Sequence, residues 1–203
     1  KRDALVKYVQ ASGLETLPFT PELRQWQARV ELVRTTTGNK AWPGVSNEQL
    51  LASMGDWLGP YLEPINLLSH FKKLDLKSIL TALLTWEQNQ QLGVLVPQRL
   101  QVPSGSSYAL DYTTTPPVLA VKLQEMFGCV DTPAVFNGLV PLAVHLLSPA
   151  GRPVQVTQDL AGFWDSSYQD VRKEMKGRYP KHSWPEDPRN AVPTRGIKTS
   201  HKN

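Results

Sequence analysis

The sequence has 203 residues, of which 40% are hydrophobic and 20% charged, a balance typical of globular rather than disordered protein. No apolar run approaches the roughly 18 residues that cross a bilayer, and a single cysteine, Cys129, excludes an internal disulfide. The net charge of +4 is uneven, because nine Lys and Arg face three Asp and Glu from Val171 to Asn203. This asymmetry indicates either a surface for a polyanion or a solvated tail. Because the chain begins without a methionine or a leader, we expect a piece of a longer soluble protein.

Residues 1–92 are predicted to form a helical subdomain. A short amphipathic segment stops at Gly13, and three further helical segments begin after residues that favour the N-cap position, Thr20, Ser46 and Asp75. The segment after Asp75, LKSILTALLTWEQNQQLG, has the broadest apolar face. We expect one long helix there, buried against its neighbours.

Residues 93–188 are predicted to form a second subdomain that contains strands. LVPQRLQVPSGSSYALDY alternates apolar and polar residues around PSGS, as a β-hairpin does. The alternative for VPSGSS is a nest of backbone N–H groups that holds a phosphate, although a plain turn is favoured. PPVLAVKLQEMFG has apolar residues at a four-residue step and is predicted as a short helix. TPAVFNG, LVPLAVHLLS and RPVQVT are predicted as strands, with turns at Asn137-Gly138 and SPAGRP.

The last predicted element is an amphipathic helix from about Asp159 to Lys176, ended by Gly177. Residues 189–203 are polar and basic and are predicted to be a disordered tail. The expected fold class is therefore α+β. A helical subdomain comes first, and a small, mostly antiparallel β subdomain with a C-terminal helix and an extended tail follows it.

Motifs for enzymatic chemistry are missing from the sequence. It contains no G-x-x-x-x-G-K-[ST] phosphate loop, no G-x-S-x-G elbow and no H-E-x-x-H metal motif. Asp111 and Glu125 are lone acids, and Cys129, in the apolar MFGCVD, is interpreted as an inert thiol. The histidines lack metal-ligand spacing and are His70, His145, His182 and His201. We therefore expect no catalytic residue, metal site or cofactor within this chain.

Several stretches are similar to one protein family. HLLSPAGRPVQVTQDLAGFWDSSYQDVRKEMKGRYPKHSWPEDP resembles the end of the bacterial HrpB family of ATP-dependent DEAH-type helicases. LLTWEQNQQLGVLVPQRLQVPSGSSYALDY, PPVLAVKLQEMFG and, more loosely, ELRQWQARVELVR also resemble that family. The similarity covers most of the chain and is dense from about Trp86 to Pro188. DSSYQ differs slightly from the form expected after GFW, within an otherwise intact helix pattern.

The resemblance implies the C-terminal region of a larger cytoplasmic helicase whose two RecA-like motor domains lie upstream. ATP and Mg²⁺ would bind to those motor domains, so this chain alone should neither hydrolyse ATP nor unwind duplexes. In related helicases, a helical part and an OB-like part help to form the path for single-stranded nucleic acid. By this analogy, residues 93–160 are expected to be a small β domain of that kind. The implied partners are single-stranded nucleic acid, foremost RNA, and the upstream motor domains.

The segment DVRKEMKGRYPKHSWPEDP has two physical interpretations. Its aromatic side chains and prolines either pack on the domain surface, or the aromatic rings stack on bases beside a basic ridge. We expect a mixture, with aromatic rings inward and cations outward. The candidate nucleic-acid-binding residues are Arg172, Lys173, Lys176, Arg178, Tyr179, Lys181, His182 and Trp184. The rival function is a protein-interaction module that recruits the helicase to a partner complex.

Overall fold

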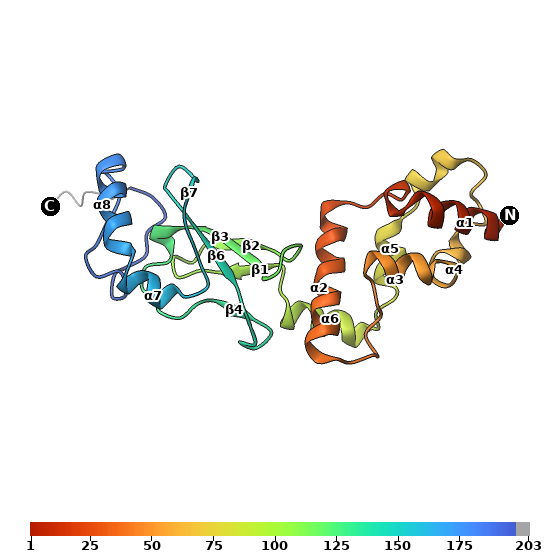
Figure 1. Ribbon diagram of the computed structural model, residues 1–203, viewed down its shortest axis with the longest axis horizontal. Coiled ribbons are helices and arrows are strands. Elements are labelled where there is room, and N and C mark those ends of the chain that lie inside the picture. Colours follow the sequence, from red (N-terminus) through yellow and green to blue (C-terminus); the bar gives the residue numbers. More distant parts are fainter. Residues whose placement is uncertain (198–203) are drawn as a thin grey trace. The chain divides into compact units, whose positions relative to one another are not determined.

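The computed structural model describes residues 1–197 and divides the chain into two compact units (Figure 1). The first is Lys1–Val96, and the second begins at Pro97. The first unit is helical and the second combines strands with helices, so the α+β class expected from the sequence is confirmed. Within the described residues, no helix is both long and apolar enough to cross a bilayer.

The helical unit consists of short helices around a shared apolar core. Its elements are α1 (Arg2–Ser12), α2 (Pro21–Thr37), α3 (Asn47–Ala52), α4 (Met54–Trp57), α5 (Leu76–Thr81) and α6 (Trp86–Leu95), with 3-10 helices at Leu14–Thr16, Gly59–Tyr61 and Leu68–Lys73. Val9 of α1, Val30 of α2 and Leu80 of α5 have no exposed surface. Burial of these side chains supplies the hydrophobic free energy that holds such short helices together.

The helix starts predicted in this unit are confirmed. Thr20, Ser46 and Asp75 each accept, through a side-chain oxygen, a hydrogen bond from the backbone N–H three residues later, at 3.1–3.2 Å. Gly38, which follows α2, has φ 64°, a left-handed conformation that glycine adopts without steric cost. These boundaries are therefore set by local chemistry.

The single long helix predicted after Asp75 is wrong, because two helices, α5 and α6, lie on either side of residues 82–85. Thr85 starts α6 with a capping box. Its hydroxyl accepts from the Gln88 N–H at 3.1 Å, and the Gln88 side chain accepts from the Thr85 N–H at 3.0 Å. This reciprocal pair satisfies N–H groups that a continuous helix would bond to its own carbonyls, so a new helix begins there.

A buried arginine of α2 holds the end of α6. Arg29 is 5% exposed, and its Nε donates to the Val96 carbonyl at 2.6 Å. Its Nη2 donates to the Leu92 carbonyl at 3.3 Å. A cation at the last carbonyls of a helix is favoured by the helix dipole as well as by these hydrogen bonds. Arg29 therefore fixes α6 against α2.

Replacing this side chain, Arg29→Met, is expected to lower the free energy of unfolding by about 2 kcal/mol, because two buried carbonyls lose charged donors. Urea unfolding followed by circular dichroism measures the change. The matched control is Arg2→Met, at a side chain that is 62% exposed, where a loss below about 0.5 kcal/mol is expected. Equal losses in the two variants would contradict a holding role for Arg29.

The second unit is built on a five-stranded sheet in the order β1-β2-β3-β6-β7, with a separate β4-β5 hairpin. Its elements are β1 (Arg99–Gln101), β2 (Ser107–Asp111), β3 (Val118–Lys122), a 3-10 turn (Leu123–Glu125), β4 (Ala134–Val135), β5 (Val140–Pro141), β6 (Ala143–Leu147), β7 (Pro153–Thr157), α7 (Leu160–Asp165) and α8 (Tyr168–Arg178). β3 and β6 are parallel, and the other pairs are antiparallel. The turns predicted at PSGS, Asn137-Gly138 and SPAGRP each join two antiparallel strands, which confirms them.

The helix predicted for PPVLAVKLQEMFG is wrong, because this segment forms β3 and the following 3-10 turn. Leu119 and Val121 lie in register with residues of β6 and have no exposed surface. The apolar step of Leu119, Leu123 and Phe127 is compatible with one face of a helix. Pairing with β6, which is distant in sequence, decides the backbone conformation instead.

The last predicted helix is divided at residues 166–167 into α7 and α8 (Figure 1). Tyr168 begins α8 with no exposed surface, and its ring lies edge-on to three aromatic rings of the core. The helix is therefore interrupted where Tyr168 enters the core. Gly177, predicted to end the helix, lies inside α8, which ends at Arg178.

Residues 189–197, the first part of the predicted disordered tail, form hydrogen bonds with the α+β unit. The Thr194 N–H donates to the Gln124 carbonyl of the 3-10 turn at 3.0 Å, and Arg195 Nε donates to a carbonyl of the β1-β2 turn at 3.0 Å. These hydrogen bonds tie the segment to two parts of the α+β unit. The rest of that prediction, residues 198–203, lies outside the described residues.

Candidate nucleic-acid interface

Trp184, a predicted stacking residue, is buried. It is 5% exposed, and its indole N–H donates to the Tyr179 carbonyl at 2.8 Å. The carbonyl of the next residue, Pro185, accepts a hydrogen bond from the Tyr168 hydroxyl at 2.7 Å. The segment after α8 therefore folds back onto that helix. Trp184 supports this fold and leaves no open ring face on which a base could stack.

Arg172 holds the same segment from the side of α8. Its Nε donates to the Trp184 carbonyl at 2.9 Å, and its Nη2 lies 3.3 Å from the Glu186 carboxylate. The Arg172 side chain is 19% exposed. This guanidinium is therefore engaged within the unit, although the sequence predicted that it would face a phosphate.

Arg178 lies on a different flank of α8 from its neighbouring lysine. Its guanidinium forms an ion pair at 3.1 Å with Glu174, four residues earlier, and both side chains are exposed. Lys176 is two residues from Arg178, and residues two apart on a helix do not face each other. The structure therefore does not bring all the predicted cations into one ridge.

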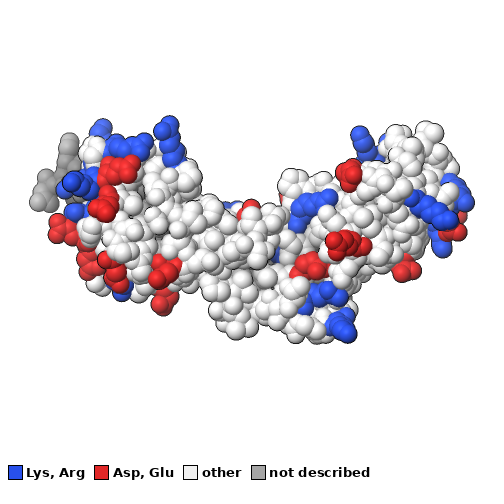
Figure 2. Space-filling model, in the orientation of Figure 1, with Lys and Arg blue, Asp and Glu red and all other residues white. Residues whose placement is uncertain are grey.

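Three predicted lysines are exposed near each other in the chain. Lys173 and Lys176 are three residues apart on α8 and share one flank, while Lys181 follows in the segment after α8. None of the ion pairs found among residues 1–197 involves these lysines. Figure 2 shows Lys and Arg gathered around the upper end of α8, with Asp and Glu below them toward α7. We name Lys173, Lys176 and Lys181 the lysine group.

The last two predicted residues, Tyr179 and His182, are half-buried and pack against each other. Their rings lie edge-on with centroids 6.2 Å apart. His182 Nδ1 is 2.9 Å from Gln124 Nε2, which connects the segment to the 3-10 turn after β3. Both side chains therefore support the segment that carries Lys181.

A buried cluster of three hydroxyl groups around one carboxylate, that of Glu125, is a feature that the sequence did not reveal. Glu125 is 3% exposed and accepts hydrogen bonds from the hydroxyls of Ser104 at 2.8 Å, Ser106 at 2.6 Å, and Tyr108. Burial acts to raise the pKa of Glu125, but these hydrogen bonds outweigh it and hold the pKa below its ordinary value. Burial and the bond to this carboxylate raise the pKa of Tyr108 to about 12.

The hydroxyls around Glu125 come from alternate positions of one hairpin, 104, 106 and 108. Side chains two apart on a strand share a face, and this spacing is the signal that could have indicated the cluster. The VPSGSS segment, for which a phosphate nest was the alternative, forms the β1-β2 turn and surrounds this carboxylate. The cluster therefore joins that turn to the 3-10 turn after β3.

Cys129 and Asp111, two further residues singled out in the sequence, bond to groups close to them in the chain. Cys129 is half-buried, with Sγ 3.2 Å from the Asp131 carbonyl. Burial, followed by the nearby Asp131 charge, raises the pKa of this thiol, which lowers its reactivity. Asp111 accepts from both the backbone N–H and the hydroxyl of Thr113. In residues 1–197, no three His, Cys, Asp or Glu side chains are placed to hold a metal ion.

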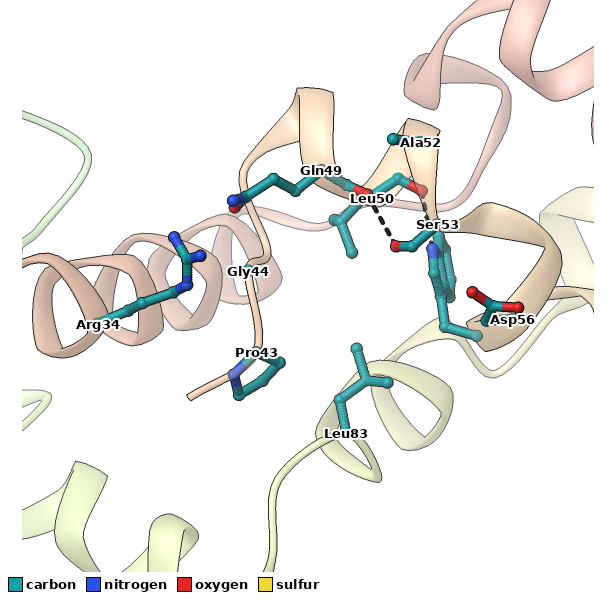
Figure 3. A pocket seen from close by; sticks show the side chains of 10 residues that line it. Arg34, Pro43, Gly44, Gln49, Leu50, Ala52, Ser53, Asp56 and Leu83 are labelled. Carbon is teal, nitrogen blue, oxygen red and sulfur yellow. Dashed lines mark hydrogen bonds between the residues drawn. The ribbon is translucent and has the colours of Figure 1, made fainter. Parts of the chain in front are cut away.

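A pocket of about 480 Å³ lies in the helical unit (Figure 3). The Ser53 hydroxyl donates to the Gln49 carbonyl at 2.7 Å, and the Trp57 indole N–H donates to the Leu50 carbonyl at 2.8 Å, so these polar groups already bond within the walls. The pocket contains none of the residues predicted to bind nucleic acid. It is lined by Arg34, Pro43, Gly44, Gln49, Leu50, Ala52, Ser53, Asp56, Trp57 and Leu83.

Residues 57–188 match the family model HrpB_C, described as ATP-dependent helicase C-terminal. The match covers the second part of the helical unit and most of the α+β unit, and it defines the class of this chain as a C-terminal region of ATP-dependent helicases. The chain belongs to the HrpB family, so the resemblance found in the sequence is confirmed.

Relatives from Escherichia coli support this assignment. The ATP-dependent RNA helicase HrpB of strain K12 is 43% identical over 196 residues, which are 96% of this chain and 24% of that protein. A crystal structure of the E. coli DExH-box NTPase HrpB matches with a TM-score of 0.86 and 42% identity, covering 96% of this chain and 24% of that one. A crystal structure of the E. coli DEAH/RHA helicase HrpB matches with a TM-score of 0.72 and 40% identity, covering 90% of this chain and 23% of that one. The chain spans about a quarter of the length of these relatives.

Proposed function

We propose that this chain is an accessory region of an ATP-dependent helicase that contacts single-stranded RNA for a motor located elsewhere in the protein. The observation that carries the proposal is the lysine group, whose three ammonium groups are exposed and outside the ion pairs of the described residues. RNA is the proposed nucleic acid because the curated relative is an RNA helicase. ATP and Mg²⁺ act at the upstream motor domains in this proposal, and the region itself performs no catalytic step.

The surroundings of the lysine group suit contact with phosphates. Arg172 and Trp184 hold the segment after α8 against the helix, so little conformational freedom of the backbone remains to be lost on binding. Lysine is a flexible point charge that bonds phosphate oxygens without requiring one geometry. Binding would release counterions from the nucleic acid, so affinity should fall with salt and depend little on base sequence.

Removing the charges in Lys173→Ala/Lys176→Ala/Lys181→Ala is expected to weaken binding to a single-stranded RNA oligonucleotide about 10- to 100-fold at low salt. The slope of log affinity against log salt should flatten by about 2, since each phosphate contact with a single strand contributes about 0.7. Fluorescence anisotropy over a series of salt concentrations measures both quantities.

The matched control carries the same loss of charge in the helical unit, at exposed residues Lys7, Lys72 and Lys77, all changed to alanine. This control should retain most of the affinity. If RNA binding weakens equally in the two triple variants, the loss of net charge alone explains the effect. The assignment of RNA contact to the lysine group would then be overturned.

The second candidate function is a protein-interaction module that recruits the helicase to a partner. The observation in its favour is three exposed apolar side chains of the helical unit, Leu67 at 62%, Leu68 at 53% and Tyr61 at 44% exposure. A chain that binds no RNA or DNA oligonucleotide in dilute salt would favour this function over RNA contact.

A further inference from the structure

Trp86 differs from every other tryptophan of this chain in its exposure to solvent. It is 72% exposed, whereas the other five are 8% exposed or less. Leaving so large an apolar ring in water is unfavourable, and tryptophan is a residue type that carries much of the binding energy at contact surfaces. Trp86 is the first residue of α6, so its backbone belongs to an ordered helix.

The exposed residues that share a face of α6 with Trp86 are uncharged, and the exposed acid Glu87 lies at the edge of this face. Asn89, Gln90, Gly93 and Val94 follow at helical spacing and are all exposed, Val94 by 75%. Side chains three and four residues from Trp86 lie beside it, and here both carry amides. An aromatic ring beside amide groups suits the flat face and the polar edge of a nucleobase.

α6 is held at both ends, so this face is rigid. At its start, the Gln88 side chain donates to the Ala41 carbonyl at 3.0 Å, which holds the loop after α2 against the first turn of α6 (Figure 1). At its end, Arg29 bonds the last carbonyls. The loop held by Gln88 also carries the exposed Lys40, a cation that can contact a phosphate.

We propose that Trp86 stacks on a base of single-stranded RNA, with Asn89 and Gln90 toward the base edge and Lys40 toward the backbone phosphate. This inference rests on the proposed function and adds a base-contacting site in the helical unit to the phosphate-contacting lysine group. The lysine group supplies affinity that depends on salt, whereas stacking on Trp86 supplies affinity that depends on the presence of bases.

Fluorescence tests this site directly, because iodide in water quenches an exposed indole far more than buried ones. An unstructured RNA oligonucleotide at saturation should remove the iodide-accessible part of the emission, and Trp86→Phe should lack that part from the start. Trp86→Ala should weaken RNA binding about 5- to 100-fold and leave the salt slope unchanged. Trp86→Phe, which keeps a ring, should retain most of the affinity.

An abasic oligonucleotide of the same length serves as the ligand control, and Trp86→Ala should bind it as tightly as the parent chain does. Leu67→Ala, at another exposed apolar residue of the helical unit, should leave RNA affinity unchanged. If Trp86→Ala binds RNA normally while the lysine variant is weakened, the stacking site is overturned and the proposed function stands. Binding to a protein partner that needs Trp86, with RNA affinity unchanged, also overturns it. If the parent chain binds no RNA, both the stacking site and the proposed function are overturned.

Discussion

Trp184→Ala is expected to lower the free energy of unfolding of the α+β unit by about 3–5 kcal/mol, the range for removal of a buried aromatic side chain. The substitution leaves a cavity beside α8 and removes the donor that satisfies the Tyr179 carbonyl. Urea denaturation monitored by circular dichroism, fitted to the transition of this unit, measures the loss.

Trp86→Ala is the matched control, because it makes the same chemical change at a ring that is 72% exposed. A change below about 0.5 kcal/mol is expected for it. A small effect at both positions would mean that the segment after α8 does not depend on Trp184 for its position. The proposal that Trp184 holds the segment carrying Lys181 against α8 would then be contradicted.

Glu125→Gln is expected to cost about 3 kcal/mol, because a neutral amide replaces an anion that accepts three hydroxyl donors inside the protein. The amide also brings two N–H donors toward groups that already donate. Thermal and urea unfolding at neutral pH measure the loss. Ser106→Ala, which removes one of the three donors, should cost about half as much. Equal costs for both variants would contradict a cluster centred on the carboxylate.

The free energy of unfolding, compared between the parent protein and Glu125→Gln as the pH is varied, gives an independent test. The pKa of Glu125 in the folded protein is held below its ordinary value of 4.5 by its hydrogen bonds. The folded state therefore binds this proton less readily than the unfolded state, and the stabilisation is complete above the ordinary pKa. It is lost as pH falls through the lowered value, so the difference between parent and Glu125→Gln should shrink below about pH 4.5. A difference that grows with acid would contradict the lowered pKa.

The candidate interface was only partly predictable from the sequence. Composition placed the excess positive charge after Val171, and this part of the chain does carry the exposed lysine group. The sequence did not distinguish those lysines from Arg172, which is turned toward the Trp184 carbonyl. That difference depends on how the segment folds back onto α8, and no pattern in the local sequence encodes it.

The helix starts at Thr20, Ser46 and Asp75 and the turn at Asn137-Gly138 were determined by local sequence. A capping side chain reaches a backbone group only three residues away, and a tight turn depends on the conformations of its own residues. The strand at Val118–Lys122 was decided only by tertiary structure, since an apolar segment adopts whichever backbone conformation its distant neighbours complete. The partners of Glu125 and the burial of Trp184 were decided in the same way, because they require contacts between segments that folding alone brings together.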